Sequence, residues 1–185
     1  MTTLRAKVAL VGPAASGKTI LANFLADHVT DGLSMPYRPT QGCRILETTM
    51  ENHSDTALEL WDVSGDINNE SGWPAITTGL DGVIVVFDIN QTVVDGDLDI
   101  WFRRFIKRPG VKSNQVLVFA NNPHRDSATR SAVDLTGPLS KAKLVLTDVT
   151  REPEAVRAAF NALMTNVRSV VEQRRDDAER KVLGM

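Results

Sequence analysis

Cysteine is almost absent from this sequence: Cys43 is the only one among 185 residues. A single thiol forms neither an internal disulfide nor a cysteine-rich metal site, and this usage is typical of the reducing cytosol. Histidine is also sparse, and His28, His53 and His124 do not have the spacing of a zinc site. We therefore expect a cytoplasmic protein without disulfides or structural zinc.

Long apolar runs and an excess of charge are missing too. No run approaches the ~20 apolar residues that cross a bilayer, and the first residues lack the apolar core of a secretory signal. The final residues, 181–185, contain no cysteine, so we expect no prenyl anchor there. The formal net charge is −2, which does not attract nucleic acid or anionic lipid. These absences argue against nucleic acid as a main partner and against a direct lipid anchor.

What is present is a regular alternation of short apolar runs and helical patterns. Residues are 42% hydrophobic and 24% charged, a balance typical of a soluble domain. We predict helices at 18–28, 97–108 and 152–181, and a hairpin connection at 52–55. The predicted strands are 6–11, 44–50, 56–61, 82–88, 115–120 and 143–146.

This order predicts one α/β domain over residues 1–185. Its six-stranded sheet is mostly parallel, has helices on both faces and carries one antiparallel edge strand from the hairpin. Ligands of such sheets bind beyond the carboxyl ends of the strands. After Glu172 the apolar helical face fades into charges of mixed sign, which predicts a solvated helical extension over about 172–185.

The strongest motif lies between the first predicted strand and the first predicted helix. Residues 12–19 match G-x-x-x-x-G-K-[ST], the phosphate-binding P-loop. Its amides converge on phosphate oxygens, Lys18 adds a cation over the β- and γ-phosphates, and Thr19 can ligate Mg²⁺. The flanking strand and helix disfavour a chance glycine turn. The nucleotide contacts expected here are Gly12, Ala14, Ala15, Ser16, Gly17, Lys18, Thr19 and Ile20.

Two later segments can complete the site. Asp62 ends a predicted strand and can reach the metal, while Gly65 can present its N–H to a γ-phosphate. Thr40 lies in a loop where its hydroxyl can reach the metal and its N–H the γ-phosphate. We therefore expect Thr19, Thr40 and Asp62 at Mg²⁺, although Thr40 could also be an ordinary loop residue.

These motifs together resemble the Ras superfamily. More narrowly, the chain resembles the Rab-like GTPase subunits of the intraflagellar transport B complex, over essentially its whole length. That narrower resemblance depends on P-T-Q-G-C-R-I-L-E at 39–47, E-L-W-D at 59–62 and E-S-G-W-P-A at 70–75. It implies a G-domain that binds GTP or GDP with Mg²⁺, coiled-coil partner subunits of that complex, and a location in the cilium or flagellum and at its base.

The residue after Gly65 departs from the GTPase pattern. Small GTPases usually have a glutamine there, which orients the attacking water, and even they hydrolyse GTP at only about 10⁻⁴ s⁻¹ without help. Here the residue is Asp66, whose carboxylate repels a γ-phosphate. We expect slower hydrolysis still; alternatively, Asp66 is only a surface residue, and hydrolysis is poor either way.

Base selection departs from the pattern as well. Guanine is normally held by N-K-x-D, whereas this chain reads Asn121-Asn122-Pro123-His124. Each lost hydrogen bond to a charged group removes about 1.5–3 kcal/mol, so we expect weaker and less selective GTP binding unless Asp126 substitutes. Base contacts are expected from Asn121 and Asn122, and from Asp148 in a loop that lacks the usual S-A-K.

Two functional hypotheses remain open from the sequence. The first is a nucleotide-loaded interaction module with little turnover, which Asp66 and His124 favour. The second is a switch GTPase whose hydrolysis a partner completes. A P-loop phosphotransferase is disfavoured because no arginine-rich, lid-like segment is present. Trp73 is either a core residue or a contact for a partner.

Overall fold

The computed structural model describes residues 4–27, 38–50, 53–91, 95–121 and 139–184. Its six-stranded sheet has the order β2-β3-β1-β4-β5-β6. Only the β2–β3 pair is antiparallel; the other neighbours are parallel. The predicted α/β architecture with one antiparallel edge strand is thereby confirmed. The strands are β1 (Leu4–Val11), β2 (Cys43–Met50), β3 (His53–Val63), β4 (Gly82–Asp88), β5 (Val116–Asn121) and β6 (Lys143–Thr147).

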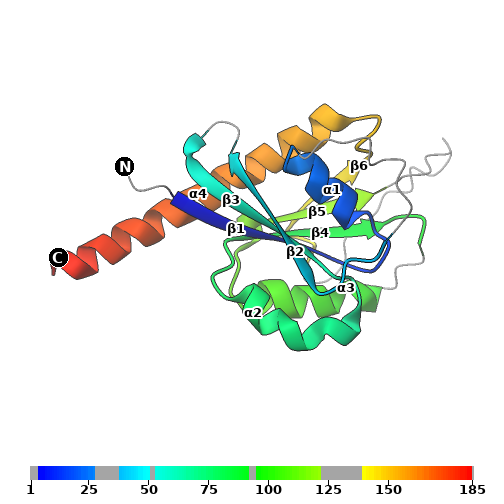
Figure 1. Cartoon of the computed structure of the whole chain (residues 1–185), viewed down its shortest axis with the longest axis horizontal. Coiled ribbons are helices and arrows are strands. Elements are labelled where there is room, and N and C mark those ends of the chain that lie inside the picture. The colour runs from blue at the N-terminus through cyan, green and yellow to red at the C-terminus, as the bar shows by residue number, and fades with distance from the viewer. Residues whose placement is uncertain (1–3, 28–37, 51–52, 92–94, 122–138, 185) are drawn as a thin grey trace.

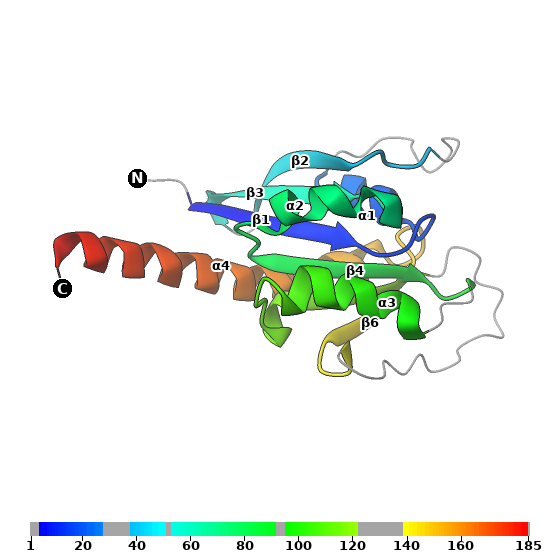
Figure 2. The same cartoon turned by 90° about the horizontal axis from the view of Figure 1, so that it is seen from below.

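Helices cover both faces of this sheet (Figures 1 and 2). Helices α1 (Lys18–Leu25) and α4 (Pro153–Leu183) pack on one face, where their buried side chains share one apolar cluster. Helices α2 (Trp73–Thr77) and α3 (Asp95–Trp101) cover the other face with a second cluster. A 3-10 turn at Ile67–Gly72 precedes α2, and another at Ser113–Gln115 precedes β5. The parallel strands therefore end at one edge of a sheet buried on both sides.

Most predicted element bounds differ from the structure by one or more residues, and the predicted hairpin connection 52–55 lies mostly within β3. Three differences are the largest. The first helix ends at Leu25 because Asp27 adopts φ 55°. Strand β3 begins at His53, because a register shift after Thr49 brings Met50 opposite His53 and lengthens the hairpin arm. The predicted helix 97–108 changes at Phe102 into a π-helix, Phe102–Lys107, in which the Arg108 N–H donates to the Arg103 carbonyl.

The aromatic side chains of this region explain the wider helical turn. Trp101 and Phe105 are both buried, with ring centroids 5.9 Å apart. The Trp73 ring lies 4.9 Å from Trp101 and 5.3 Å from Phe105, and Trp73 is only 2% exposed. The core alternative for Trp73 is therefore the correct one. The π turn keeps Trp101, Phe105 and Ile106 on the buried face.

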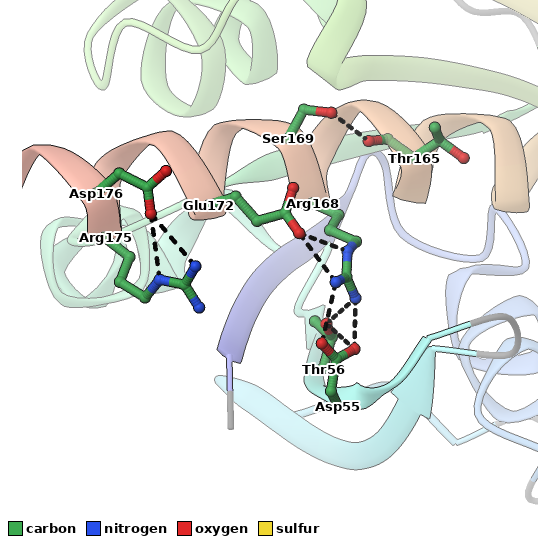
Figure 3. Close-up of polar contacts among 8 residues, drawn as sticks. All are labelled: Asp55, Thr56, Thr165, Arg168, Ser169, Glu172, Arg175 and Asp176. Carbon is green, nitrogen blue, oxygen red and sulfur yellow. Dashed lines mark hydrogen bonds and ion pairs between the residues drawn. The ribbon is translucent and has the colours of Figure 1, made fainter. Parts of the chain in front are cut away.

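Helix α4 is tied to the start of β3 by a polar cluster (Figure 3). The Arg168 guanidinium forms a two-pronged ion pair with Asp55, at 2.5 Å to Oδ1 and 3.0 Å to Oδ2. It also donates to Thr56 Oγ1 at 2.7 Å and to Glu172 Oε1 at 2.9 Å. The Arg168 hydrogen bonds lower the pKa of Asp55 to about 2. This contact adds a polar link between α4 and β3 to the apolar packing of α4 on the sheet.

Beyond this cluster α4 continues past the sheet. Arg174 Nη1 donates to Asp81 Oδ1 at 2.6 Å, and every residue from Gln173 to Gly184 is exposed. Figures 1 and 2 show this end of α4 projecting away from the ends of β1 and β4 that lead into their following loops. Within the described residues, none of the helices combines the length and apolarity that crossing a bilayer needs.

Candidate nucleotide-binding site

The loop between β1 and α1 has the backbone that its motif predicts. Gly17 precedes α1 with φ 89°, and a Cβ there would lie 2.2 Å from Asn121 Nδ2. That same amide donates to the Ser16 carbonyl at 3.1 Å. Only glycine allows this close approach, so the end of β5 supports the loop from outside. Asn121, predicted as a base contact, thus supports the P-loop in this structure.

Lys18 lies over the same loop. Its Nζ donates to the Gly12 carbonyl at 2.9 Å, the Pro13 carbonyl at 2.6 Å and Ser16 Oγ at 3.3 Å. Burial lowers the pKa of Lys18 to about 8, while the charge of Asp62 partly offsets this effect. Its hydrogen-bond partners are all neutral oxygens, so no carboxylate is hydrogen-bonded to the ammonium, which is available to an incoming phosphate at pH values below about 8.

Three oxygen-bearing side chains meet beside Lys18. Thr19 Oγ1 donates to Asp62 Oδ2 at 2.8 Å, and Thr40 Oγ1 lies 3.2 Å from the same oxygen and 2.9 Å from Thr19 Oγ1. They come from α1, from the loop before β2 and from β3. The structure therefore brings together all three residues predicted at Mg²⁺.

These oxygens suit magnesium, a hard cation that prefers oxygen ligands and keeps several of its waters. Asp62 is fully buried, yet its Oδ1 has no hydrogen-bond partner in the described structure. A buried carboxylate oxygen left without a partner is costly, and a cation would satisfy it. No group of three or more His, Cys, Asp or Glu side chains suits a metal within the described residues. One carboxylate and two hydroxyls are the donor set that this site offers.

Two residues that the sequence analysis did not single out adjoin this cluster. Arg44 lies directly opposite Asp62 in the β2–β3 register, with Nη2 3.5 Å from Asp62 Oδ2. The same nitrogen donates to Asn23 Oδ1 at 2.7 Å. The hairpin register is the signal that would have placed Arg44 opposite Asp62. That register depends on the length of the connection between the two strands, which the sequence does not specify.

Gly65 brings the segment after β3 against the P-loop. A Cβ on Gly65 would lie 2.4 Å from Ala14 N and 2.5 Å from the Pro13 carbonyl carbon. The neighbouring Ser64 is buried, and its N–H donates to the Gly42 carbonyl at 2.8 Å. The Gly65 backbone is thus held where a phosphate on the P-loop would be within reach.

Asp66 is engaged in its own turn. Its side chain is exposed, and Oδ1 accepts a hydrogen bond from Asn68 N at 2.9 Å, which caps the 3-10 turn Ile67–Gly72. Ser64 Oγ accepts from Asp66 N at 3.2 Å and from Asn69 Nδ2 at 3.1 Å. This arrangement gives the carboxylate a structural role in the turn.

The remaining predicted contacts lie around this centre. Ala14, Ala15 and Ile20 are exposed, and Ser16 is buried. The Asp148 carboxylate is buried and accepts from Thr150 N and Arg151 N, each at 3.1 Å, so it organises the turn before α4. Its contact with a base stays a prediction. Asn122, His124 and Asp126 lie outside the described residues.

Comparison with known proteins agrees with the observed fold. Residues 7–123 match the Roc family, "Ras of Complex, Roc, domain of DAPkinase". The human intraflagellar transport protein 22 homolog is 32% identical over 188 aligned positions, covering 97% of this chain and 99% of the relative. GDP-bound T. brucei IFT22 superposes with a TM-score of 0.71 at 25% identity, covering 92% of this chain and 98% of that one. A chain of the GTP-bound T. brucei IFT22/74/81 structure superposes with a TM-score of 0.70 at 26% identity, covering 90% of this chain and 98% of that one.

Proposed function

This chain belongs to the intraflagellar transport protein 22 family and has a Ras-like G-domain, and from that premise we propose that it binds GTP or GDP with Mg²⁺ as a subunit of the intraflagellar transport B complex. Its site of action would be the cilium or flagellum and its base, with a pool in the cytoplasm. In this role it docks on coiled-coil partner subunits and hydrolyses little GTP.

One observation carries the nucleotide part of the proposal. The unpartnered Oδ1 of Asp62 lies in a cluster with Thr19 and Thr40, beside the P-loop ammonium of Lys18. Lys18 and the loop amides would hold the phosphates, and the three oxygen-bearing side chains would hold Mg²⁺. The metal, when bound, neutralises phosphate charge. Thr40 would link its own loop to the metal and so order that loop around the nucleotide.

The expectation of little hydrolysis depends on Asp66. An anionic side chain that caps its own turn neither orients a water nor stabilises the charge that develops on a transferring phosphoryl group. We therefore expect single-turnover hydrolysis below the ~10⁻⁴ s⁻¹ of unassisted small GTPases.

The partner proposal draws on the relatives. The T. brucei relative was solved with GTP as IFT22/74/81, so partners of that kind are the ones to test here. If the nucleotide controls docking, the partner must bind the GTP and GDP forms with different affinity. Equal affinity would leave an interaction module, whereas a large preference would support a switch GTPase.

A matched pair of glycine variants tests the nucleotide site. Gly65→Ala places a methyl 2.4 Å from Ala14 N, whereas Gly72→Ala meets nothing within 4 Å at a φ of −84°. We expect G65A to reduce GTP affinity at least tenfold and G72A to retain it, as measured by equilibrium binding of radiolabelled GTP with Mg²⁺. An unchanged affinity in G65A, or no GTP retention by the unmodified protein, would refute the proposed site.

A further inference from the structure

Arg44 is a cation placed within the proposed metal site. Strands β2 and β3 put it directly opposite Asp62, so both side chains extend from the same face of the sheet. Its guanidinium lies 3.5 Å from Asp62 Oδ2, the oxygen that also accepts from Thr19. Asn23 on α1 holds the same nitrogen at 2.7 Å. Three elements thus fix this charge beside the oxygen cluster.

The burial of Asp62 explains why a cation is needed there. Asp62 is 0% exposed, and among the ion pairs of the described residues only that with Arg44 involves it. A buried carboxylate without a nearby cation is strongly destabilising. Arg44 supplies a neutralising charge through a direct ion pair, and Lys18 adds a second positive charge nearby. The other carboxylate oxygen, Oδ1, has no hydrogen-bond partner in the described structure.

The same placement opposes a metal ion. Mg²⁺ at the Thr19, Thr40 and Asp62 oxygens would lie within several ångströms of the guanidinium. At about 6 Å, even in a dielectric like that of water, repulsion between a univalent and a divalent cation corresponds to about a tenfold loss of affinity. The Arg44 side chain is 44% exposed, which permits this water-like screening.

We propose that Arg44 is the resident counter-cation of Asp62, and that it raises the Mg²⁺ concentration at which this protein retains its nucleotide. The inference builds on the proposed GTP and Mg²⁺ site. Arg44 acts here as a positioning and tuning residue, since it acts through Asp62, the proposed metal ligand with which it forms an ion pair. Its effect is that nucleotide is released and exchanged more readily than the oxygen ligands alone would allow.

Mg²⁺ titrations of charge variants test this inference. Fluorescently labelled GDP is bound, and its retention is followed from micromolar to millimolar Mg²⁺. We expect Arg44→Gln to lower the Mg²⁺ midpoint about tenfold, because the repulsion is removed. Arg44→Lys, which keeps the charge, should stay near the unmodified protein. Arg5→Gln is the matched control, since Arg5 pairs with Glu59 on the same sheet through an exposed side chain.

The direction of the change separates tuning from damage. A variant that only disturbs the fold would need a higher Mg²⁺ concentration to retain labelled GDP, whereas R44Q should need a lower one. An R44Q midpoint equal to or above that of the unmodified protein overturns the inference, even if labelled GDP binds normally.

A measurement without nucleotide keeps the two proposals distinguishable. If no variant retains GDP, the proposed function fails, and the melting temperature in EDTA and in Mg²⁺ decides about Arg44. We expect R44Q to have a lower melting temperature than R5Q in EDTA. We also expect Mg²⁺ to raise the melting temperature of R44Q more than that of R5Q. Equal melting temperatures of R44Q and R5Q in EDTA would overturn the role of Arg44.

Discussion

At the scale of single residues, the ammonium of Lys18 is buried without a hydrogen bond to a carboxylate. Lys18 is only 6% exposed, yet all three hydrogen-bond acceptors of its ammonium are neutral. Burial disfavours the charged form and brings its pKa to about 8. A phosphate in the loop would reverse this effect, because an adjacent anion favours the ammonium. Nucleotide binding and protonation of Lys18 are therefore coupled.

That coupling predicts a pH dependence with a definite sign. Between pH 8 and the ordinary lysine pKa of 10.5, the free folded protein loses the proton that the bound form retains, so binding takes up a proton. We expect GTP affinity to be nearly constant from pH 7 to 7.5 and to fall toward tenfold per pH unit above about 8. Calorimetry from pH 7 to 9 checks this. Lys18→Arg keeps its charge, so its profile should be flat; a parallel decline in both proteins would contradict the prediction.

The same scale shows which residues the sequence could predict. Gly17, Lys18 and Thr19 follow from a motif whose spacing is local, and Asp62 follows from its place at the end of a strand. Arg44 and Asn23 could not be predicted, because their role arises from the antiparallel register and from the packing of α1 beside β2. Asp66 was correctly identified as a departure, but its capping of the next turn depends on a backbone conformation that the sequence did not reveal.

At the scale of elements, α4 is held at two separated points. Arg168 joins it to the start of β3, and Arg174 joins it to Asp81 just before β4. Asp81 is 2% exposed and also accepts from Lys7 N at 2.9 Å. Burial raises the pKa of Asp81, while the Lys7 hydrogen bond and the Arg174 charge oppose that shift. Among the described residues, Arg174 is therefore the last residue of α4 with an ion pair to a residue outside the helix.

Neighbouring arginines on α4 provide a matched test. Arg174→Ala leaves the buried Asp81 without its arginine, and we expect the free energy of unfolding to fall by about 2 kcal/mol. Arg175→Ala removes only an exposed pair with Asp176 and should change it by less than about 0.5 kcal/mol. Urea denaturation of both variants measures the difference. Similar values for the two would show that the Asp81 contact contributes little.

Element types were predictable, whereas most of their ends were not. The buried strand 82–88 was predicted to the residue because continuous apolar character and the following polar residues define it. The π-helix after Trp101 arises from packing of Trp101 and Phe105 against Trp73, which lies 28 residues before Trp101 in the sequence. Tertiary packing of this kind overrides a helical period read along one segment.

At the scale of the whole molecule, the sheet order places the P-loop, the end of β3 and the end of β5 along one edge. The proposed phosphate and metal contacts would come from the middle of that edge, and the proposed base contacts from β5 and the loop after β6. The first group matches the GTPase pattern, and the second departs from it at Asn122 and His124. The sequence thus combines a phosphate-binding motif that matches the GTPase pattern with a base-binding motif that departs from it.

This division predicts weak discrimination between purines. Ligand at 100 times its dissociation constant stabilises a protein by about 2.7 kcal/mol, which for a domain of this size raises the melting temperature by roughly 5–10 °C. We expect GTP with Mg²⁺ to give such a shift and ATP at equal concentration to give at least half of it. Lys18→Ala should show neither. A shift with GTP and none with ATP would show that other residues restore guanine selection.

The projecting end of α4 also affects how this protein behaves as a particle. The whole of α4 has 31 residues and forms a rod about 45 Å long. The last part of this rod extends beyond the sheet (Figure 2). An elongated body tumbles anisotropically and has a larger hydrodynamic radius than a sphere of equal mass. A single copy of this chain would therefore elute early from a gel-filtration column, and its elution volume alone would mistake a monomer for something heavier.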